Sequence, residues 1–522
     1  MLGKFKLYCG TIKYLKPEQI FWRVAKRMGM KCALRGVRIP EKNCRPMLRV
    51  EELEHDSVFL ARFSAEELLR DHVSFLHEGE KFQWDGPWQI KTRSHLWNFN
   101  LHYFEYLHTL AKRFLETGDG KYLDKSVQMI RGWIQQNPEE KGGDGWSAYT
   151  ISLRLTNWMA WYSAVHSFLD ASFREIMEDS IHEQYVFLSE HLEKEILGNH
   201  YFENVKALVL CALFFDDQDA LSVFIREFRK ECREEVLPDG MHFELSPMYH
   251  KIVLEGLLRV AAGLRKAGRP DAPLEQMAQD MVNAAYSMEH GLARTPLFND
   301  SGDNVAKSLD ALLDCAKRYL GITPVYRASL PDSGYYFFEN GPWKLIVDAG
   351  AAGPDYIPGH SHCDAMSFEL YRNGAPVLVN CGTYAYQCGE RHYFRSTEAH
   401  NTVQAAGVEQ SEIWSTFRLA GRSRTRVLAV SENGIRMEMT DYRGNRIQRE
   451  IMLTEDALYI KDCGENLRLR SHLHSINKIE INSSGECDWT EAIYAPEFGL
   501  LQNIHKITVT GAERLETKIL LR

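Results

Sequence analysis

The spacing of apolar residues changes once along the chain, and this change limits the folds that the sequence can adopt. From about Ser64 to Leu320 apolar residues recur three or four positions apart, as in Leu107, Leu110 and Phe114, which is the period of an amphipathic helix. Short breaks rich in Gly, Pro and Asp separate about ten such segments. This cadence predicts a toroid of helical hairpins with a cleft at one end.

Beyond residues 324–331 the pattern becomes that of β-strands. Three Asn-Gly pairs, Asn340-Gly341, Asn373-Gly374 and Asn433-Gly434, lie between β-rich runs, as hairpin turns do. The second half is therefore expected to be an antiparallel β-sandwich. The predicted fold is α+β and multidomain, with an N-terminal extension at 1–60, a helical catalytic domain at 61–323 and the β-sandwich at 332–522.

Composition narrows the class of protein. A chain of 522 residues is too long for one ordinary core. The formal charge of −9 arises from mixed charges, which argues against a nucleic-acid partner. Eleven cysteines without a CxxC pair are typical of free thiols in a reducing compartment.

The N-terminal residues 1–30 alternate apolar residues with Lys and Arg and lack the apolar run of a signal peptide. No stretch of the sequence is long and uncharged enough to predict a membrane span. We expect a cytoplasmic protein, or a periplasmic one if a leader has been removed.

The segment Gly359-His360-Ser361-His362-Cys363-Asp364 carries the first candidate site. In an extended strand His360 and His362 project from the same face, so that one can bind an ion while the other faces its neighbour. Asn380 and His400 follow in the same β-rich region. The three candidate metal ligands are His362, Asn380 and His400.

Two further clusters lie in the helical half. Asn199 and His200 precede an apolar helix at 205–215, where they can donate hydrogen bonds to a carboxylate with help from the helix dipole. The alternative is a helix cap formed by Asn199 or Asn204. Tyr249 begins another helix, and a lone tyrosine there is usually a packing residue.

Taken in order, these clusters resemble the heparinase II/III-like family of polysaccharide lyases. The resemblance also includes Trp97-Asn98-Phe99-Asn100, Trp146, the segment 154–158 and the segment 395–402, and it covers about four fifths of the chain. It implies an incomplete α/α toroid followed by an antiparallel β-sandwich. It also implies cleavage of uronic-acid polysaccharides by β-elimination.

The resemblance assigns roles to individual residues. Asn199 and His200 match the family's carboxylate-facing pair, Tyr249 its catalytic tyrosine, and Tyr386 a second tyrosine from the β-domain. The C5 proton of a uronate becomes removable once donors neutralise the carboxylate charge. His360 is expected to face the substrate rather than a metal ion.

A tyrosine that acts as a base needs help, because its ordinary pKa is about 10. Positive charge from His200, His360 or Arg395 could supply that help. Arg395 and Arg154 are also candidates for substrate binding, although an arginine on an aromatic helix equally often pairs with a buried acid. Glu203, the third candidate, could orient His200 or simply cap a helix.

The metal site departs from the family pattern. Many relatives have an aspartate where this chain has Asn380, and a neutral amide is a poor zinc ligand. Three alternatives remain: one divalent ion, zinc by preference, held more weakly; an ion held with help from Asp364; or a hydrogen-bonded cluster without an ion. Asp300 and Asp303 resemble a calcium loop, but a polar turn is the expected interpretation.

These observations predict a carbon–oxygen lyase that acts on an acidic, uronate-containing polysaccharide or oligosaccharide such as a glycosaminoglycan. A uronate C5-epimerase on the same scaffold shares the first step, the removal of the C5 proton. A non-catalytic protein of glycan binding or polysaccharide assembly is the rival from another class, and Asn380 is its best support.

Overall fold

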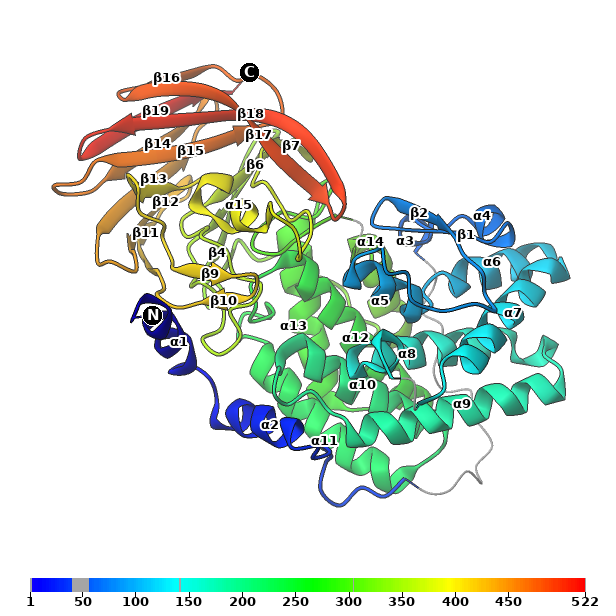
Figure 1. Ribbon diagram of the computed structural model, residues 1–522. Helices are drawn as coiled ribbons and strands as arrows, with labels where there is room; N and C mark the ends of the chain where they lie inside the picture. The colour runs from blue at the N-terminus through cyan, green and yellow to red at the C-terminus, as the bar shows by residue number, and fades with distance from the viewer. Residues whose placement is uncertain (1, 40–55, 140–141, 304, 522) are drawn as a thin grey trace.

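The computed structural model describes residues 2–39, 56–139, 142–303 and 305–521. The expected N-terminal extension at 1–60 therefore lies partly outside the described residues. Helices fill one half of the molecule and two β-sheets fill the other (Figure 1). The predicted α+β fold is confirmed. The change from helices to strands takes place between Leu320 and Ser329, and the domain limits 61–323 and 332–522 stay predictions.

The first elements are two separate helices and a small α/β unit. They are α1 (Leu2–Ile12), α2 (Pro17–Arg27), α3 (Ser57–Leu60), α4 (Ala65–Leu69), β1 (His72–Phe75) and β2 (Glu78–Lys81). The helical body follows, with α5 (His95–Tyr103), α6 (Leu107–Thr117), α7 (Gly120–Gln136), α8 (Ala148–Val165), α9 (Ala171–Glu190), α10 (Gly198–Phe214), α11 (Gln218–Glu235), α12 (Pro247–Lys266), α13 (Ala272–Glu289) and α14 (Leu309–Cys315).

The helices are arranged as hairpins around a buried inner set. The pairs α6 and α7, α10 and α11, and α12 and α13 pack side by side, and α10 also packs against α8 and α12. Acidic and serine caps start many of the helices; Asp170, Asp217 and Ser246 each accept a backbone N–H of the first turn. Every residue of α10 except His200 is buried. A helix that is buried on all sides lies inside the bundle rather than on its surface.

The second half is a two-sheet sandwich. The larger sheet has the order β17-β18-β15-β7-β6-β5-β4-β3, with β8 beside β15, and the smaller has the order β11-β12-β13-β14-β19-β16. The strands of the larger sheet are β3 (Ser329–Leu330), β4 (Tyr335–Asn340), β5 (Trp343–Asp348), β6 (Phe368–Arg372), β7 (Ala375–Leu378), β8 (Val403–Ala405), β15 (Leu469–Ser475), β17 (Glu486–Glu497) and β18 (Leu500–Gly511). Those of the smaller are β11 (Arg424–Val430), β12 (Gly434–Thr440), β13 (Arg446–Leu453), β14 (Ala457–Cys463), β16 (Ile481–Ser483) and β19 (Arg514–Leu520).

The hairpin turns lie where the sequence predicted them. The turn between β6 and β7 has positive φ at both Asn373 and Gly374, 49° and 81°, as a two-residue turn of type I′ requires. Between the sheets lies one apolar core, to which both sheets contribute, for example Leu345 and Leu473 from one and Met437 and Ile447 from the other.

The segment between β7 and β8 and the hairpin after it face the helical body. This segment carries the short helix α15 (Arg391–Arg395), and the hairpin consists of β9 (Ile413–Ser415) and β10 (Arg418–Leu419). Among the described residues the ten cysteines are free thiols. Within that same part of the chain, no helix is long and apolar enough to cross a membrane.

Candidate active site

Asn199 and His200, the pair expected to face the substrate carboxylate, lie at the first turn of α10. Leu197 and Gly198 both have left-handed backbone conformations, with φ of 66° and 57°, and together they turn the chain into the helix. A Cβ added to Gly198 would lie 2.9 Å from Cδ1 of Ile357 and 3.1 Å from Oε1 of Glu244. Glycine is therefore required here both by the backbone angle and by the space. The turn places Asn199 and His200 at the positive end of a long buried helix.

Glu193 orients His200 from behind. Nδ1 of His200 donates to Oε1 of Glu193 at 3.1 Å, and Nδ2 of Asn204 donates to Oε2 of the same carboxylate at 3.0 Å. The imidazole also packs against the ring of Tyr149 at an angle of 36°, with ring centroids 4.4 Å apart. Burial alone would lower the pKa of His200, but the Glu193 carboxylate raises it above its ordinary value. The ring is held in place and is biased toward its cationic form.

The two tyrosines meet from different domains. Tyr249 lies in the first turn of α12, and its hydroxyl is 2.7 Å from that of Tyr386, which follows β7. His360 stacks on Tyr249, with ring centroids 4.0 Å apart and an angle of 15° between the rings. The Nδ1 atom of His360 is hydrogen-bonded to the carboxylate of Glu244. Both phenols are thus fixed by aromatic and polar neighbours.

Glu244 links this tyrosine pair to the α10 pair. Its carboxylate is hydrogen-bonded to the imidazole of His360, and its Oε1 lies beside the start of α10, 3.1 Å from the position of a Cβ at Gly198. Burial would raise the pKa of Glu244, but His360 lowers it below its ordinary value. The buried Glu244 carboxylate therefore joins elements of both domains.

The pKa of both tyrosines is raised above its ordinary value, which favours the neutral phenol. Burial is the main cause that raises the pKa of Tyr249, and the nearby Tyr386 adds to it. Burial and the Asp300 carboxylate raise the pKa of Tyr386, although the Arg391 guanidinium, 5.2 Å from its ring centroid, opposes them. A neutral phenol is the form that can give a proton to a leaving oxygen.

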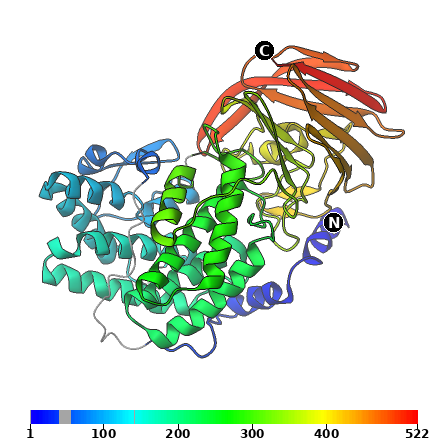
Figure 2. The same cartoon turned by 180° about the vertical axis from the view of Figure 1, so that it is seen from behind.

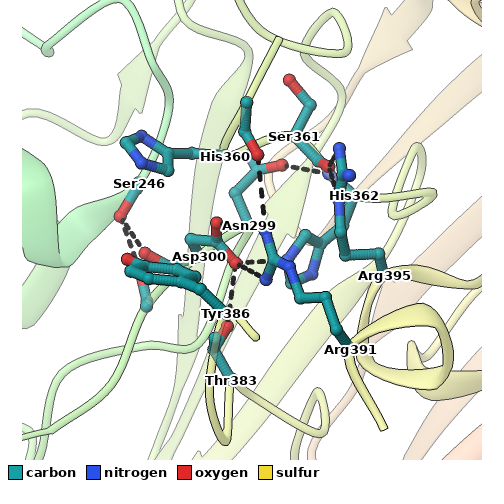
Figure 3. Close-up of polar contacts among 12 residues, drawn as sticks. Ser246, Asn299, Asp300, His360, Ser361, His362, Thr383, Tyr386, Arg391 and Arg395 are labelled. Atoms are coloured by element: carbon teal, nitrogen blue, oxygen red, sulfur yellow. Dashed lines mark hydrogen bonds and ion pairs between the residues drawn. The ribbon is translucent and has the colours of Figure 1, made fainter. Parts of the chain in front are cut away.

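Asp300 is the centre of a second buried network, shown in Figure 3. Nη2 of Arg391 donates to Oδ2 of Asp300 at 2.7 Å, and the other terminal guanidinium nitrogen contacts Oδ1. Nε2 of His362 donates to Oδ1 at 2.8 Å, and the hydroxyl of Thr383 donates to it at 3.1 Å. Although burial opposes ionisation, Arg391 and His362 keep the pKa of Asp300 below its ordinary value.

The neighbouring Asp303 has different partners. Its backbone N–H donates to Pro496 at 2.6 Å, and its carboxylate accepts from Thr295 at 3.4 Å. Asp300 and Asp303 thus bind different partners, as in a polar turn and not in a calcium loop.

His362 and His400 face one another. Nδ1 of His362 and Nε2 of His400 are 3.1 Å apart. The outer nitrogens have acceptors as partners, the Asp300 carboxylate at 2.8 Å for His362 and the Ser396 carbonyl at 2.8 Å for His400. Each outer nitrogen therefore carries a proton, and the two inner nitrogens present lone pairs to one another. Burial, which lowers the pKa of both rings to about 4, favours these neutral forms.

The facing lone pairs of His362 and His400 suit a bound cation, but Asn380 is poorly suited as a third ligand. The amide oxygen of Asn380 accepts the backbone N–H of Asn401 at 3.0 Å, and its buried Nδ2 has no hydrogen-bond partner. Asp364 accepts the backbone N–H of Asn299 at 3.0 Å. Within the described ranges, no three His, Cys, Asp or Glu side chains converge as an ion would require. The residues fit a two-histidine site without a carboxylate ligand.

Three residues predicted to bind substrate are buried in the protein interior instead. Arg154 is fully buried; its Nε donates to Gln184 at 2.7 Å, and its guanidinium stacks on Trp133 at 3.8 Å. Glu203, also buried, is paired with Lys206. It does not orient His200.

Arg395 is likewise fully buried. Its guanidinium donates to four backbone carbonyls, those of Pro358, Ser361, Ser415 and Thr416, at 2.8 to 3.2 Å. It therefore fixes the loop that carries His360 and does not reach a substrate.

Sequence reasoning missed the acidic partners and Arg391. Glu244 lies in the same motif as Tyr249, and Glu193 lies seven residues before His200. Both carboxylates lie close in sequence to predicted site residues, but nothing in the sequence identified their histidine partners. Arg391 lies in a segment without a motif and meets Asp300 only through the docking of the domains.

Two family models match consecutive parts of the chain, and several known proteins are similar to it in sequence. A family model described as "Heparinase II/III N-terminus" matches residues 48–321, and one described as "Heparinase II/III-like, C-terminal" matches residues 323–484. A heparin-sulfate lyase of Pedobacter heparinus is 27% identical over 364 residues, which are 62% of this chain and 54% of that protein. A heparin-sulfate lyase of Bacteroides stercoris is 22% identical over 468 residues, 76% of this chain and 66% of that protein.

The crystal structure of heparinase III has the same fold. It matches with a TM-score of 0.70 at 16% identity, over 93% of this chain and 87% of that one. The chain spans about half to two thirds of the length of the two curated relatives. The N-terminal family model alone covers more than half of the 522 residues. The chain belongs to the heparinase II/III family.

Proposed function

We propose that this protein is a polysaccharide lyase that cleaves a uronate-containing glycan by β-elimination between C4 and C5. The observation that carries the proposal is the Tyr249–Tyr386 pair, whose hydroxyls are 2.7 Å apart. His360 stacks on Tyr249 and is hydrogen-bonded to Glu244, which lies beside the start of α10 that carries Asn199 and His200. Elimination needs a charge-neutralising group and a proton-transfer group on one small site. The described arrangement supplies both.

Asn199 and His200 bind the uronate carboxylate in this proposal. The amide, the imidazole with its raised pKa and the start of α10 all favour an anion. Neutralising the carboxylate makes the C5 proton more acidic, because the charge that develops on removal spreads onto the carboxylate oxygens. Glu193 keeps the imidazole in position for this contact.

Tyr249 carries the proton transfers. As a phenolate it removes the C5 proton, and as a phenol it returns that proton to O4 as the C4–O bond breaks. Its phenolate needs donors, and the Tyr386 hydroxyl is within hydrogen-bond distance while the His360 ring lies against its face. The two hydroxyls lie side by side, which suits a proton removed and returned on the same face. An epimerase would need donors on opposite faces of the sugar.

The substrate class in this proposal is a glycosaminoglycan or a related acidic polysaccharide. The curated relatives are named as heparin-sulfate lyases, and a site built around donors for a carboxylate agrees with a polyanionic substrate. We also propose a divalent ion, zinc by preference, between His362 and His400. It would tie the His360-bearing loop to the segment before β8 as a structural cross-link.

The experiment uses uronate polymers in deuterated water. Heparan sulfate, chondroitin sulfate, hyaluronan and alginate are incubated with the protein and examined by mass spectrometry, NMR and ultraviolet absorbance. We expect shorter chains that carry a C4–C5 double bond. The Tyr249→Phe variant should fold normally and lose at least about 100-fold in turnover, whereas Tyr326→Phe, a half-exposed tyrosine outside the site, should retain activity.

Other results would overturn the proposal. Deuterium at C5 with unchanged chain length would assign an epimerase. Neither change over the whole panel, together with binding of a glycan by the folded protein, would assign a binding or assembly role.

A further inference from the structure

The first two helices expose an unusual number of large apolar side chains. On α1 Phe5, Tyr8 and Ile12 are 51 to 69% exposed. On α2 and the residue after it, Ile20, Phe21, Val24 and Met28 are 42 to 69% exposed. Scattered exposed apolar residues are ordinary, but seven within 24 consecutive residues form a continuous feature.

The apolar side chains of α2 point away from the protein. Ile20, Phe21, Val24 and Met28 recur at the spacing of one helix face. The opposite face carries Gln19, whose amide donates to the carbonyl of Ile196 at 3.1 Å, together with Arg23 and Lys26, which contact Glu195 at 3.2 and 2.6 Å. A surface helix normally packs its apolar face inward. This helix docks through polar contacts together with Trp22 and Ala25, and it leaves the stripe of Ile20, Phe21, Val24 and Met28 to solvent.

Helix α1 repeats the arrangement. Thr11 is buried against β10, where its hydroxyl lies 3.3 Å from the carbonyl of Leu419, and it also accepts from Trp414 at 3.1 Å. Phe5 and Ile12 are on the outward face. Both helices run along the periphery of the molecule, from the β9–β10 hairpin to the side of α11 (Figures 1 and 2). Their apolar faces therefore lie at one edge.

Positive charge is concentrated in the N-terminal segment of the chain. Residues 1–39 contain ten Lys and Arg and one Glu, a formal charge of +9, whereas the whole chain is −9. Some of these cations dock the helices on acidic partners, as Lys16 does with Glu234. Lys6, Lys13 and Arg27 are exposed beside the apolar stripes. Basic residues beside exposed aromatic and aliphatic ones are typical of interfacial helices on anionic lipid.

We propose that residues 2–28, the N-terminal arm, bind the surface of an anionic lipid bilayer. The helices lie in the headgroup plane, Phe5, Phe21 and Met28 enter the acyl boundary, and Lys6, Lys13 and Arg27 contact lipid phosphates. Each helix has 11 residues, roughly 16 Å of length against a hydrocarbon core of about 30 Å, so the arm lies on the bilayer and does not span it. The charge of the arm favours a lipid surface over an apolar protein groove.

The test is co-sedimentation of the full-length protein with vesicles at low ionic strength. One set of vesicles is phosphatidylcholine, and the other is equimolar phosphatidylcholine and phosphatidylglycerol. We expect binding to the anionic vesicles, little binding to the neutral ones, and release by added salt.

Two triple variants separate the contributions. Phe5→Ser with Phe21→Ser and Met28→Ser removes the apolar contacts, and Lys6→Gln with Lys13→Gln and Arg27→Gln removes the charges. Each should weaken partitioning at least tenfold. The matched control is Phe168→Ser with Val325→Ser and Val430→Ser, which removes three side chains that are 52 to 59% exposed elsewhere. It should bind vesicles as the parent protein does, and all three variants should keep the parent melting temperature.

Three outcomes would overturn the proposal. The protein would fail to sediment with anionic vesicles at low salt, or the control variant would lose binding as strongly as the arm variants. In the third, the parent would self-associate in sedimentation velocity without binding vesicles and the apolar arm variant would be monomeric, which would assign this face to a second copy of the chain.

Discussion

At the scale of single residues, His200 depends on a carboxylate that the sequence places seven positions away. The ring is the one side chain of α10 that is not buried, and Glu193 both fixes its direction and raises its pKa. A group with a raised pKa stays cationic above its ordinary range and loses its charge as the pH rises through the new value. Activity that needs the cation should therefore decline on the alkaline side.

The Glu193→Gln variant tests this dependence. Glutamine keeps the size of the side chain but removes the charge, so the pKa of His200 should fall. We expect the alkaline limb of kcat/KM to move by roughly one unit toward lower pH. The control Glu190→Gln removes an exposed carboxylate paired with Lys31 and should leave the profile unchanged. An unmoved limb in Glu193→Gln would mean that another group sets it.

Residue identity alone predicted the site only in part. Asn199, His200, Tyr249, Tyr386 and His360 come together as their motifs indicated. The burial of charged residues on aromatic helices was harder to predict. Arg154 is buried because it contacts Gln184 and Trp133, which are distant in the sequence. Glu203 and Arg395 are buried as well, and their partners, Lys206 and a set of backbone carbonyls, could not be identified before folding.

At the scale of elements, the left-handed turn before α10 sets the direction of the active-site pair. Gly198→Ala should cost stability through its φ of 57° and through the contact of the new Cβ with Ile357 and Glu244. We expect a loss of at least about 2 kcal/mol and at least a tenfold lower kcat, measured by urea unfolding and steady-state kinetics.

Gly268 is the matched control for this prediction. It has a φ of 72° and no atom within 4 Å of a built Cβ, so Gly268→Ala should cost about 1 kcal/mol from the backbone angle alone and leave kcat unchanged. Equal effects of the two substitutions would show that the steric contact of the new Cβ at Gly198 contributes nothing.

The pair of facing histidines predicts a cation that holds two loops together. Protein purified without added metal should contain close to one equivalent of zinc, and chelation should lower its melting temperature, since a ligand that binds only the folded state stabilises it. In His362→Gln chelation should have no further effect. Less than about a tenth of an equivalent, with an unchanged melting temperature after chelation, would favour the hydrogen-bonded cluster.

Element types were more predictable than their contacts. The helical period over 64–320 and the Asn-Gly turns follow from local rules, and positive φ at Asn373 and Gly374 bears this out. The polar docking of α2 was not predicted. Its apolar stripe reads from sequence like that of any surface helix, and only the position of Gln19, Arg23 and Lys26 against the body shows which side faces solvent.

At the scale of the whole molecule, the two domains share buried charges. Arg391 of α15 and Asp300 of the helical half form a two-pronged ion pair that is almost fully excluded from water. Such a pair costs little while both partners are present, but its loss leaves a buried charge without compensation.

Arg391→Leu should therefore destabilise the protein by about 3 to 5 kcal/mol and separate the unfolding of the two domains. Calorimetry should show one transition in the parent protein and two in the variant. Arg514→Leu, which removes an exposed pair with Glu516, should cost less than about 1 kcal/mol and keep one transition. A single unshifted transition in Arg391→Leu would mean that other contacts hold the domains.

The distribution of Tyr249 and Tyr386 over two halves of the chain has a consequence for the order of events during synthesis. The ribosome completes α14, the last helix of the helical body, 71 residues before it reaches Tyr386. A nascent or truncated chain that ends between Cys315 and Tyr386 lacks the second phenol and Arg391, although helices α5 to α14 are complete. If the proposed mechanism holds, the site is complete only after the first strands of the larger sheet have been made, and an unfinished chain lacks lyase activity.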